Sequence, residues 1–150
     1  MIEINGVAHV AFTVSEWERC RAFYEALLSF LGLKRVFGGN DSIYYVGGRT
    51  AVGVGRCEAG YASERFVQGG VGLHHICFRC RSREDVDKVH EFLLTQDANI
   101  IHAPEEGPWA PGYYSILFED PAGVRIEMNH VPGRGILDEG VQFNPAGDYR

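Results

Sequence analysis

The segment YSILFEDPAGVRIEMNH, residues 114–130, consists of two largely apolar runs separated by Asp-Pro-Ala-Gly. Asp, Pro and Gly in this order are typical of a type I turn, so the segment predicts a β-hairpin that turns at residues 120–123. In its second strand, Ile126 and Met128 are the natural core residues. Because successive side chains of a strand point to opposite faces, Glu127 is predicted to lie on the other, concave face of the sheet.

The chain is an internal duplication with an offset of 66 positions. With this shift, HVAF at residues 9–12 falls on HICF at residues 75–78, and EALL at residues 25–28 falls on EFLL at residues 91–94. In both copies an alternating apolar segment comes first, which is the pattern of a strand with one buried face. Two copies of one structural unit explain these matches.

A helix is predicted after the first strand of each copy. The first helix is expected to begin at Ser15, with Glu18 as the partner in a capping box, and to end at Gly32. The second is expected to begin at Ser82, with Asp85 in the equivalent position. Turn residues then separate short strands, so each half reads as strand, helix and two or three strands. The fold class is therefore α+β.

The length and composition of the chain limit its possible domain organisation and binding partners. A chain of 150 residues with 45% hydrophobic residues can fill one core, and we expect a single domain that consists of module one (about 5–55), a linker (about 56–72), module two (about 73–130) and a polar tail (131–150). A net charge of −6 argues against nucleic acid, which is bound by clustered Lys and Arg. The N-terminus has no signal-peptide pattern, and no long apolar run occurs. We expect a cytoplasmic protein without a membrane partner, whose four cysteines are reduced thiols.

Three side chains are candidate metal ligands. His9 and His75 occupy the same position of the duplicated unit, and alternation places both on the concave face with Glu127. A lone histidine on a strand is more often a hydrogen-bonded structural residue. Two equivalent imidazoles and a carboxylate on an otherwise buried strand, however, are a favourable ligand set for a first-row divalent ion. They also leave coordination positions for substrate or water.

Other polar residues near these candidates have weaker signals. Arg79 and Arg125 would share the concave face, where each could grip a carboxylate or phosphate of a substrate or pair with a neighbouring acid. Alternation turns His74 away from His75, which suggests that His74 is a structural or a strand-end residue. The CxxC formed by Cys77 and Cys80 fits neither a zinc knuckle nor a redox pair, because a separation of three puts the two thiols on opposite faces of a strand.

The segment 103–114 is rich in Pro and Gly and carries Trp109, Tyr113 and Tyr114. Two interpretations have equal weight. The segment is either a lid or pocket wall, or an ordinary surface loop whose aromatic rings pack on the edge of the sheet.

The segments GVAHVAFTVS (residues 6–15) and GLHHICFRC (residues 72–80), together with the aromatic-x-Asp-Pro-x-Gly-x-x-x-Glu pattern that ends at Glu127, resemble the vicinal oxygen chelate superfamily. That superfamily includes glyoxalase I, methylmalonyl-CoA epimerase, fosfomycin-resistance enzymes, bleomycin-resistance proteins and extradiol dioxygenases. The resemblance implies two paired βαβββ modules that form a cupped mixed sheet with the helices outside. It also implies a metal on the concave side, held by His9, His75 and Glu127, and a symmetric homodimer.

The sequence departs from two branches of that superfamily. Many members have a ligand on the last strand of the first module, where this chain has residues 50–54 (TAVGV) without a coordinating side chain. This difference makes glyoxalase I activity less expected. Extradiol enzymes would have a His before the closing hairpin and a Tyr within it, whereas this chain has Trp109 and Leu117 there. Ring cleavage is therefore less expected as well.

Our first functional hypothesis is a metal-dependent lyase, isomerase or transferase that acts on a small oxygen-chelating metabolite. It requires one divalent ion (manganese, iron, nickel or zinc), and the site could form within one chain or across a dimer. The candidate proton carriers are Tyr113, Tyr114 and His102, and the candidate substrate-binding residues are Arg79, Arg125 and Trp109. The alternative is a protein that sequesters a drug or metabolite without metal, as bleomycin-resistance proteins do. A third hypothesis is a purely structural or interaction role.

Overall fold

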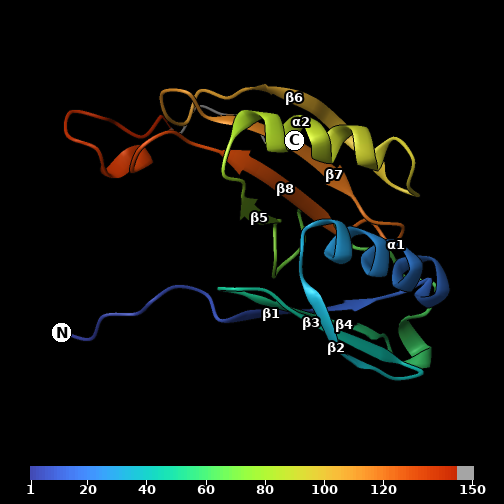
Figure 1. Ribbon diagram of the computed structural model, residues 1–150. Helices are drawn as coiled ribbons and strands as arrows, with labels where there is room; N and C mark the ends of the chain where they lie inside the picture. Colours follow the sequence, from blue (N-terminus) through green and yellow to red (C-terminus); the bar gives the residue numbers. More distant parts are fainter. Residues whose placement is uncertain (145–150) are drawn as a thin grey trace. The chain divides into compact units, whose positions relative to one another are not determined.

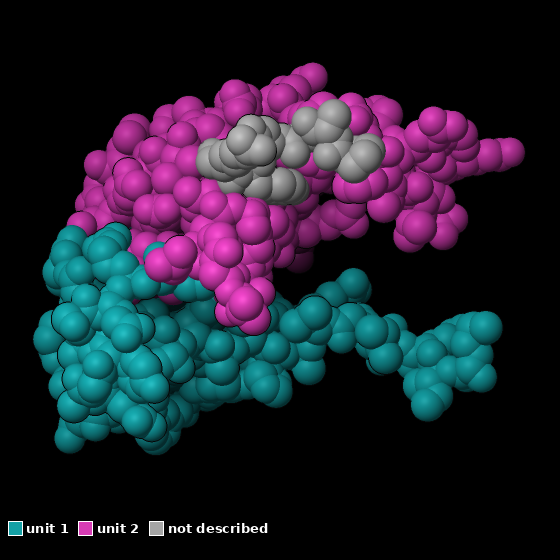
Figure 2. Space-filling model, turned by 180° about the vertical axis from the view of Figure 1, so that it is seen from behind, with its two compact units in different colours: residues 1–66 teal, residues 67–150 magenta. Residues whose placement is uncertain are grey.

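The computed structural model describes residues 1–144. The chain divides into two compact units, unit 1 (residues 1–66) and unit 2 (residues 67–150), which Figure 2 shows in teal and magenta. Within the described residues, each unit contains one four-stranded sheet with one α-helix against it (Figure 1).

Unit 1 has the element order strand, helix, strand, strand, strand. Its elements are β1 (His9–Val14), α1 (Trp17–Phe30), β2 (Lys34–Gly38), β3 (Ser42–Val46), β4 (Ala51–Arg56) and the 3₁₀ helix η1 (Ala59–Tyr61). The strand order in the sheet is β1-β4-β3-β2. The β1 and β4 strands are parallel, and the other pairs are antiparallel.

Unit 2 repeats this topology. Its elements are β5 (Ile76–Arg79), α2 (Arg83–Leu93), β6 (Asn99–Glu106), β7 (Tyr114–Glu119), β8 (Arg125–His130) and the 3₁₀ helix η2 (Gly135–Leu137). The order is β5-β8-β7-β6, and β5 and β8 are parallel. The helices α1 and α2 begin at Trp17 and Arg83, which are separated by the 66 positions of the duplication. The predicted α+β class and βαβββ modules are thus confirmed.

The start of α1 differs from the prediction. The residue before the helix is Glu16, and its backbone is left-handed, with φ 49° and ψ 45°. No side chain caps this end of the helix, so the predicted capping box of Ser15 and Glu18 is wrong. The chain has to reverse between the end of β1 and the first turn of α1, and the left-handed residue makes this reversal. This requirement of the tertiary structure outweighs the local capping preference.

Two other helix ends agree with the prediction. Gly32 follows α1 with φ +80°, and the N–H of Leu33 donates to the carbonyl of Leu28 at 2.9 Å, as in a Schellman motif. At the start of α2, the hydroxyl of Ser82 accepts a hydrogen bond of 3.2 Å from the N–H of Asp85.

The hydrophobic core follows the predicted alternation. On β1, Phe12 and Val14 are buried and His9 is exposed. On β8, Ile126 and Met128 are buried under α2, which contacts β6, β7 and β8 (Figure 1). Full burial of such a side chain contributes about 1.5–3 kcal/mol. The core of each unit therefore fixes which face of its strands remains for polar residues.

The closing hairpin has the predicted turn, whereas segment 103–114 is not wholly a loop. The carboxylate of Asp120 accepts a hydrogen bond of 2.8 Å from the N–H of Val124, and the Gly123 N–H donates to the Asp120 carbonyl. Residues 103–106 belong to β6, so the loop spans residues 107–113 only. None of the helices in the described part of the chain is long and apolar enough to cross a membrane.

Candidate functional site

Glu127 occupies the face of the unit 2 sheet that lies opposite α2. Its strand neighbours Ile126 and Met128 point into the core beneath α2, and Glu127 points the other way. The residues directly opposite Glu127 on the two adjacent strands are Cys77 and Leu117. Glu127 is only 1% exposed, so its carboxylate is removed from bulk water.

The two carboxylate oxygens of Glu127 have different surroundings. The phenol of Tyr113 donates a hydrogen bond of 2.6 Å to Oε1. Oε2 lies 3.2 Å from Nε2 of His75. This contact lacks the alignment of a hydrogen bond, and Oε2 is buried without a hydrogen-bond partner among the described residues. Such an oxygen is costly to bury unless another group binds it.

These contacts control the ionisation of Glu127. Burial by itself raises the pKa of the carboxyl group. The ring of His75 and the phenol of Tyr113 outweigh this effect, and the pKa lies below its ordinary value. Glu127 is therefore a carboxylate at neutral pH.

His75 is held from its other side by a chain of polar contacts. Its Nδ1 lies 2.7 Å from Nδ1 of His74, and Nε2 of His74 contacts the amide nitrogen of Gln68. The prediction that His74 turns away from His75 is wrong, because β5 begins at Ile76 and the irregular backbone before it does not alternate. Sequence reasoning also missed Gln68, which lies in the segment between β4 and β5 that has no regular period.

Tyr113 is supported by the loop that precedes β7. The rings of Trp109 and Tyr113 pack with centroids 5.0 Å apart, and Trp109 is 8% exposed. A Cβ atom at Gly107 would collide with the Trp109 ring, so glycine is needed there. The rings of this loop thus pack on each other, and Tyr113 of the same loop also contacts Glu127 of the candidate site. Burial and the Glu127 carboxylate raise the pKa of Tyr113 well above its ordinary value, so its phenol is a neutral donor.

The other two candidate proton carriers lie on different faces. The hydroxyl of Tyr114 donates to Asp87 of α2 at 2.7 Å, and the guanidinium of Arg83 lies over its ring. Tyr114 thus belongs to the helix-covered face. His102 on β6 is directly opposite Leu117, so it shares the face of Glu127 at a distance of about two strand spacings, roughly 10 Å.

The two candidate anion-binding arginines also differ. Arg125 forms an ion pair of 3.1 Å with Glu119 and donates a hydrogen bond of 2.7 Å to Oε1 of Gln68. Its side chain is 14% exposed, so it is already engaged within the protein. Arg79 is exposed and lies opposite Asn129, two residues from Glu127, on the same face of the sheet.

Cys77 is a neighbour of Glu127 whose importance sequence reasoning did not recognise. Cys77 is exposed as a residue, but its thiol faces Glu127, and desolvation of the thiol together with the charge of Glu127 raises its pKa. The strand register could have identified this pair, because Cys77 and Glu127 are Cα partners in the β5–β8 ladder. All four cysteines are free thiols.

His9, the remaining candidate metal ligand, is the first residue of β1 in unit 1 and is exposed. The register also explains the missing ligand on β4. Ala11 pairs with Gly53 as Cys77 pairs with Glu127, so Gly53 occupies the position equivalent to Glu127. A Cβ atom at Gly53 would lie 3.1 Å from the ring of Tyr44, which fills the space over this position.

Across residues 1–144, no three His, Cys, Asp or Glu side chains gather as one group able to hold a metal ion.

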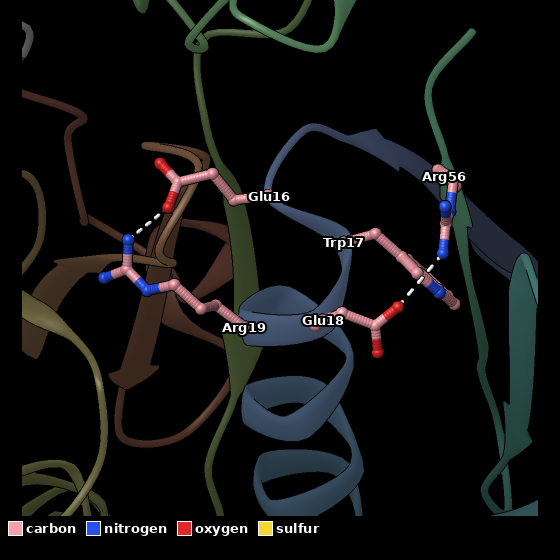
Figure 3. A pocket seen from close by; sticks show the side chains of 5 residues that line it. All are labelled: Glu16, Trp17, Glu18, Arg19 and Arg56. Carbon is pink, nitrogen blue, oxygen red and sulfur yellow. Dashed lines mark hydrogen bonds and ion pairs between the residues drawn. The ribbon is translucent and has the colours of Figure 1, made fainter. Parts of the chain in front are cut away.

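A separate open pocket of about 300 Å³ lies at the start of α1 in unit 1 (Figure 3). It is lined by Glu16, Trp17, Glu18, Arg19 and Arg56. Its charged side chains pair with one another, Glu16 with Arg19 and Glu18 with Arg56. The pocket contains none of the candidate residues.

Comparison with known proteins identifies the relatives of this chain. The family model described as Glyoxalase/Bleomycin resistance protein/Dioxygenase superfamily matches residues 6–128. The uncharacterized protein YqjT of Bacillus subtilis (strain 168) is 25% identical over 122 residues, which cover 80% of this chain and 94% of that protein.

Two solved structures share the fold. A glyoxylase/bleomycin resistance protein/dioxygenase domain from Frankia sp. EAN1pec is 21% identical, with a TM-score of 0.68 over 85% of this chain and 98% of that one. A lactoylglutathione lyase from Agrobacterium tumefaciens is 19% identical, with a TM-score of 0.60 over 85% of this chain and 94% of that one.

Proposed function

The chain belongs to the Glyoxalase/Bleomycin resistance protein/Dioxygenase superfamily, and on that premise we propose that it is a divalent-metal-dependent enzyme. The reaction is of the lyase, isomerase or transferase type, and the substrate is a small oxygen-chelating metabolite. Members of this superfamily commonly bind a divalent metal and small molecules. The observation that carries the proposal is the carboxylate of Glu127, which is buried with one oxygen that lacks a hydrogen-bond partner among the described residues.

The pair His75 and Glu127 fits a divalent ion. Donor atoms that share one first-row ion, each at about 2.0–2.2 Å, lie roughly 3.0–3.5 Å apart. Nε2 of His75 and Oε2 of Glu127 are separated by 3.2 Å and are not aligned as a hydrogen bond. Tyr113 leaves Oε2 available because it binds Oε1. A cation between these atoms would satisfy the buried oxygen.

His9 is the proposed third ligand, on the evidence of its equivalent position in the duplicated unit. Manganese, iron, nickel and zinc all accept two imidazoles and one carboxylate. When bound, the ion would act as a Lewis acid that stabilises negative charge on a substrate oxygen. The third ligand can come from the same chain or from the partner in a symmetric homodimer, a common assembly in this superfamily.

The protein's own residues have distinct proposed roles. Tyr113 keeps the Glu127 carboxylate in place as a neutral donor, because its pKa is raised. His102 is the preferred proton carrier, since it lies on the face of Glu127 at a separation that a small substrate can span. Arg79 is exposed on the same face and can bind an anionic group of the substrate. Tyr114, Arg125 and Trp109 are already engaged in contacts within unit 2.

Metal content tests the proposal directly. The purified protein is stripped with a chelator, dialysed against Mn²⁺, Fe²⁺, Ni²⁺ or Zn²⁺ in turn, and examined by elemental analysis. We expect about one ion per chain, with occupancy lost in His75→Ala, Glu127→Ala and His9→Ala. His90→Ala, a histidine on α2, is the matched control and should retain the ion. Unchanged occupancy in all three ligand variants would overturn the proposal.

Two further measurements separate the alternatives. A sequestering protein would still bind its ligand in the presence of a chelator and would lose binding in Trp109→Ala. A site shared between two chains would be recovered when His9→Ala and Glu127→Ala proteins are mixed, because one of the mixed sites would then be intact.

A further inference from the structure

Unit 2 contains a continuous chain of polar contacts that ends at His75. The guanidinium of Arg125 donates to Oε1 of Gln68 at 2.7 Å, the amide nitrogen of Gln68 contacts Nε2 of His74, and Nδ1 of His74 lies 2.7 Å from Nδ1 of His75. The last ring nitrogen, Nε2 of His75, lies 3.2 Å from Oε2 of Glu127. Each side chain in this series can donate or accept a hydrogen bond only at certain atoms, so the chain of polar contacts has a direction.

The direction is set by Arg125. A guanidinium has only donors, so the atom of Gln68 that faces it must be the carbonyl oxygen. The NH₂ group of Gln68 therefore faces His74, and Nε2 of His74 must accept. Arg125 is held in this position by its ion pair with Glu119 at 3.1 Å. The amide of Gln68 thus cannot reverse without losing a charge-assisted hydrogen bond.

The tautomers of the two histidines follow from this direction. With Nε2 as an acceptor, neutral His74 carries its proton on Nδ1 and donates it to Nδ1 of His75. Nδ1 of His75 is then an acceptor, so neutral His75 carries its proton on Nε2. This nitrogen lies 3.2 Å from Oε2 of Glu127, close enough for electrostatic attraction to the carboxylate although the two groups are not aligned as a hydrogen bond.

We propose that Gln68, acting through His74, is a positioning residue that fixes the tautomer of His75 with its proton on Nε2 in the metal-free protein. The consequence rests on the proposed metal site. A protonated ring nitrogen has no lone pair for a metal, so a cation that binds through Nε2 must displace this proton. The groups that accept hydrogen bonds from most metal-binding histidines do the opposite and hold the proton on the ring nitrogen that does not bind the metal. Here Gln68 would weaken metal binding and favour the pairing of His75 with Glu127.

Gln68→Glu should reverse the direction of the hydrogen bonds in this chain of polar contacts, and the two side chains have nearly the same shape. A carboxylate has no donor, so it accepts both from Arg125 and from Nε2 of His74. His74 then accepts at Nδ1, and His75 must donate from Nδ1, which frees its Nε2. Gln96→Glu is the matched control, because it adds the same charge at a glutamine whose amide donates to Thr95.

The tautomers are read by long-range ¹H–¹⁵N correlation NMR of the ¹⁵N-labelled, metal-free protein, with His75 assigned by the loss of its signals in His75→Gln. We expect His75 to carry its proton on Nε2 in the wild type and in Gln96→Glu, and on Nδ1 in Gln68→Glu. A wild-type His75 protonated on Nδ1, or the same tautomer in all three proteins, would overturn the proposal. This readout does not require metal.

Titration with Zn²⁺ provides the second measurement. If His75 is a ligand, Gln68→Glu should bind Zn²⁺ about tenfold more tightly than Gln96→Glu, since changes in the residues that hydrogen-bond a metal ligand alter affinity by about 10- to 100-fold. Equal affinities would contradict the proposed effect on metal binding. If the tautomer switches but neither protein binds metal, the role of Gln68 is supported and the proposed function fails. If metal binds but the tautomer does not respond to Gln68, the proposed function is supported and the role of Gln68 is overturned.

Discussion

Tyr113 donates a hydrogen bond of 2.6 Å to Oε1 of the buried Glu127 carboxylate. The next residue, Tyr114, donates a bond of 2.7 Å to Asp87, an exposed contact on the helix side of the sheet. Two adjacent tyrosines thus make bonds of nearly equal length in opposite environments. The burial of the acceptor carboxylate, and not the length of the hydrogen bond, should determine how much each hydroxyl contributes to stability.

Tyr113→Phe should lower the free energy of unfolding by about 1–3 kcal/mol, the cost of a buried polar group that loses its partner. Tyr114→Phe is the matched control and should cost less, because water can replace the hydroxyl at the surface. Urea unfolding at pH 7, followed by circular dichroism, measures both. Equal losses in the two variants, or a larger loss for Tyr114→Phe, would contradict the assigned environments.

The stability of the protein should depend on pH through Glu127. Its pKa in the folded protein is lowered, because the contacts with His75 and Tyr113 outweigh burial. The ionised carboxylate therefore contributes stability above its ordinary pKa, and this contribution is lost as the pH falls through the lowered value. The difference in unfolding free energy between the wild type and Glu127→Gln should shrink as the pH falls from 6 to 3. Urea unfolding across this pH range measures this difference. A difference that grows as the pH falls would contradict the lowered pKa of Glu127.

Glu127 should also control the reactivity of Cys77. Desolvation of the thiol and the charge of Glu127 raise the pKa of Cys77, although the residue as a whole is exposed, whereas the pKa of Cys80 is raised to about 11 by burial and Asp85. Glu127→Gln should therefore accelerate alkylation of Cys77 by iodoacetamide at pH 8.5 by about twofold or more, because the thiolate is the nucleophile. Cys80 serves as the control within the same protein. An unchanged ratio of the two rates in peptide mass spectrometry would argue against the coupling.

The fold could be predicted because two independent patterns agree. Alternation in residues 9–14 and 114–130 fixes which strand residues enter the core, and the offset of 66 positions assigns the same topology to both halves. The wrong prediction for the fold concerns a place where the polypeptide changes direction. Glu16 adopts its left-handed conformation because β1 and α1 must be joined there, and no local pattern distinguishes this from a capping box at Ser15.

The candidate site could be predicted only as far as strand periodicity reaches. Alternation placed Glu127 opposite the core because β8 is regular. It failed for His74, which precedes β5, and it could not separate Tyr113 from Tyr114, because the first residue of β7 decides which face each occupies. Gln68 lies in an irregular segment, and its role depends on a contact with Arg125 across 57 residues. Such a contact leaves no periodic signal in the sequence.

The left-handed backbone of Glu16 has a cost that a substitution can remove. A side chain at φ 49° costs about 1–2 kcal/mol relative to a right-handed residue, and glycine avoids this cost. Glu16 forms ion pairs with Arg19 and Arg65, but both arginines are exposed and such pairs contribute little. Glu16→Gly should therefore raise the free energy of unfolding by about 0.5–1 kcal/mol. Glu18→Gly, inside the first turn of α1, should lower it by about 1 kcal/mol. Urea unfolding measures the free energy of unfolding of both variants. If Glu16→Gly loses as much stability as Glu18→Gly, the backbone at residue 16 carries no strain.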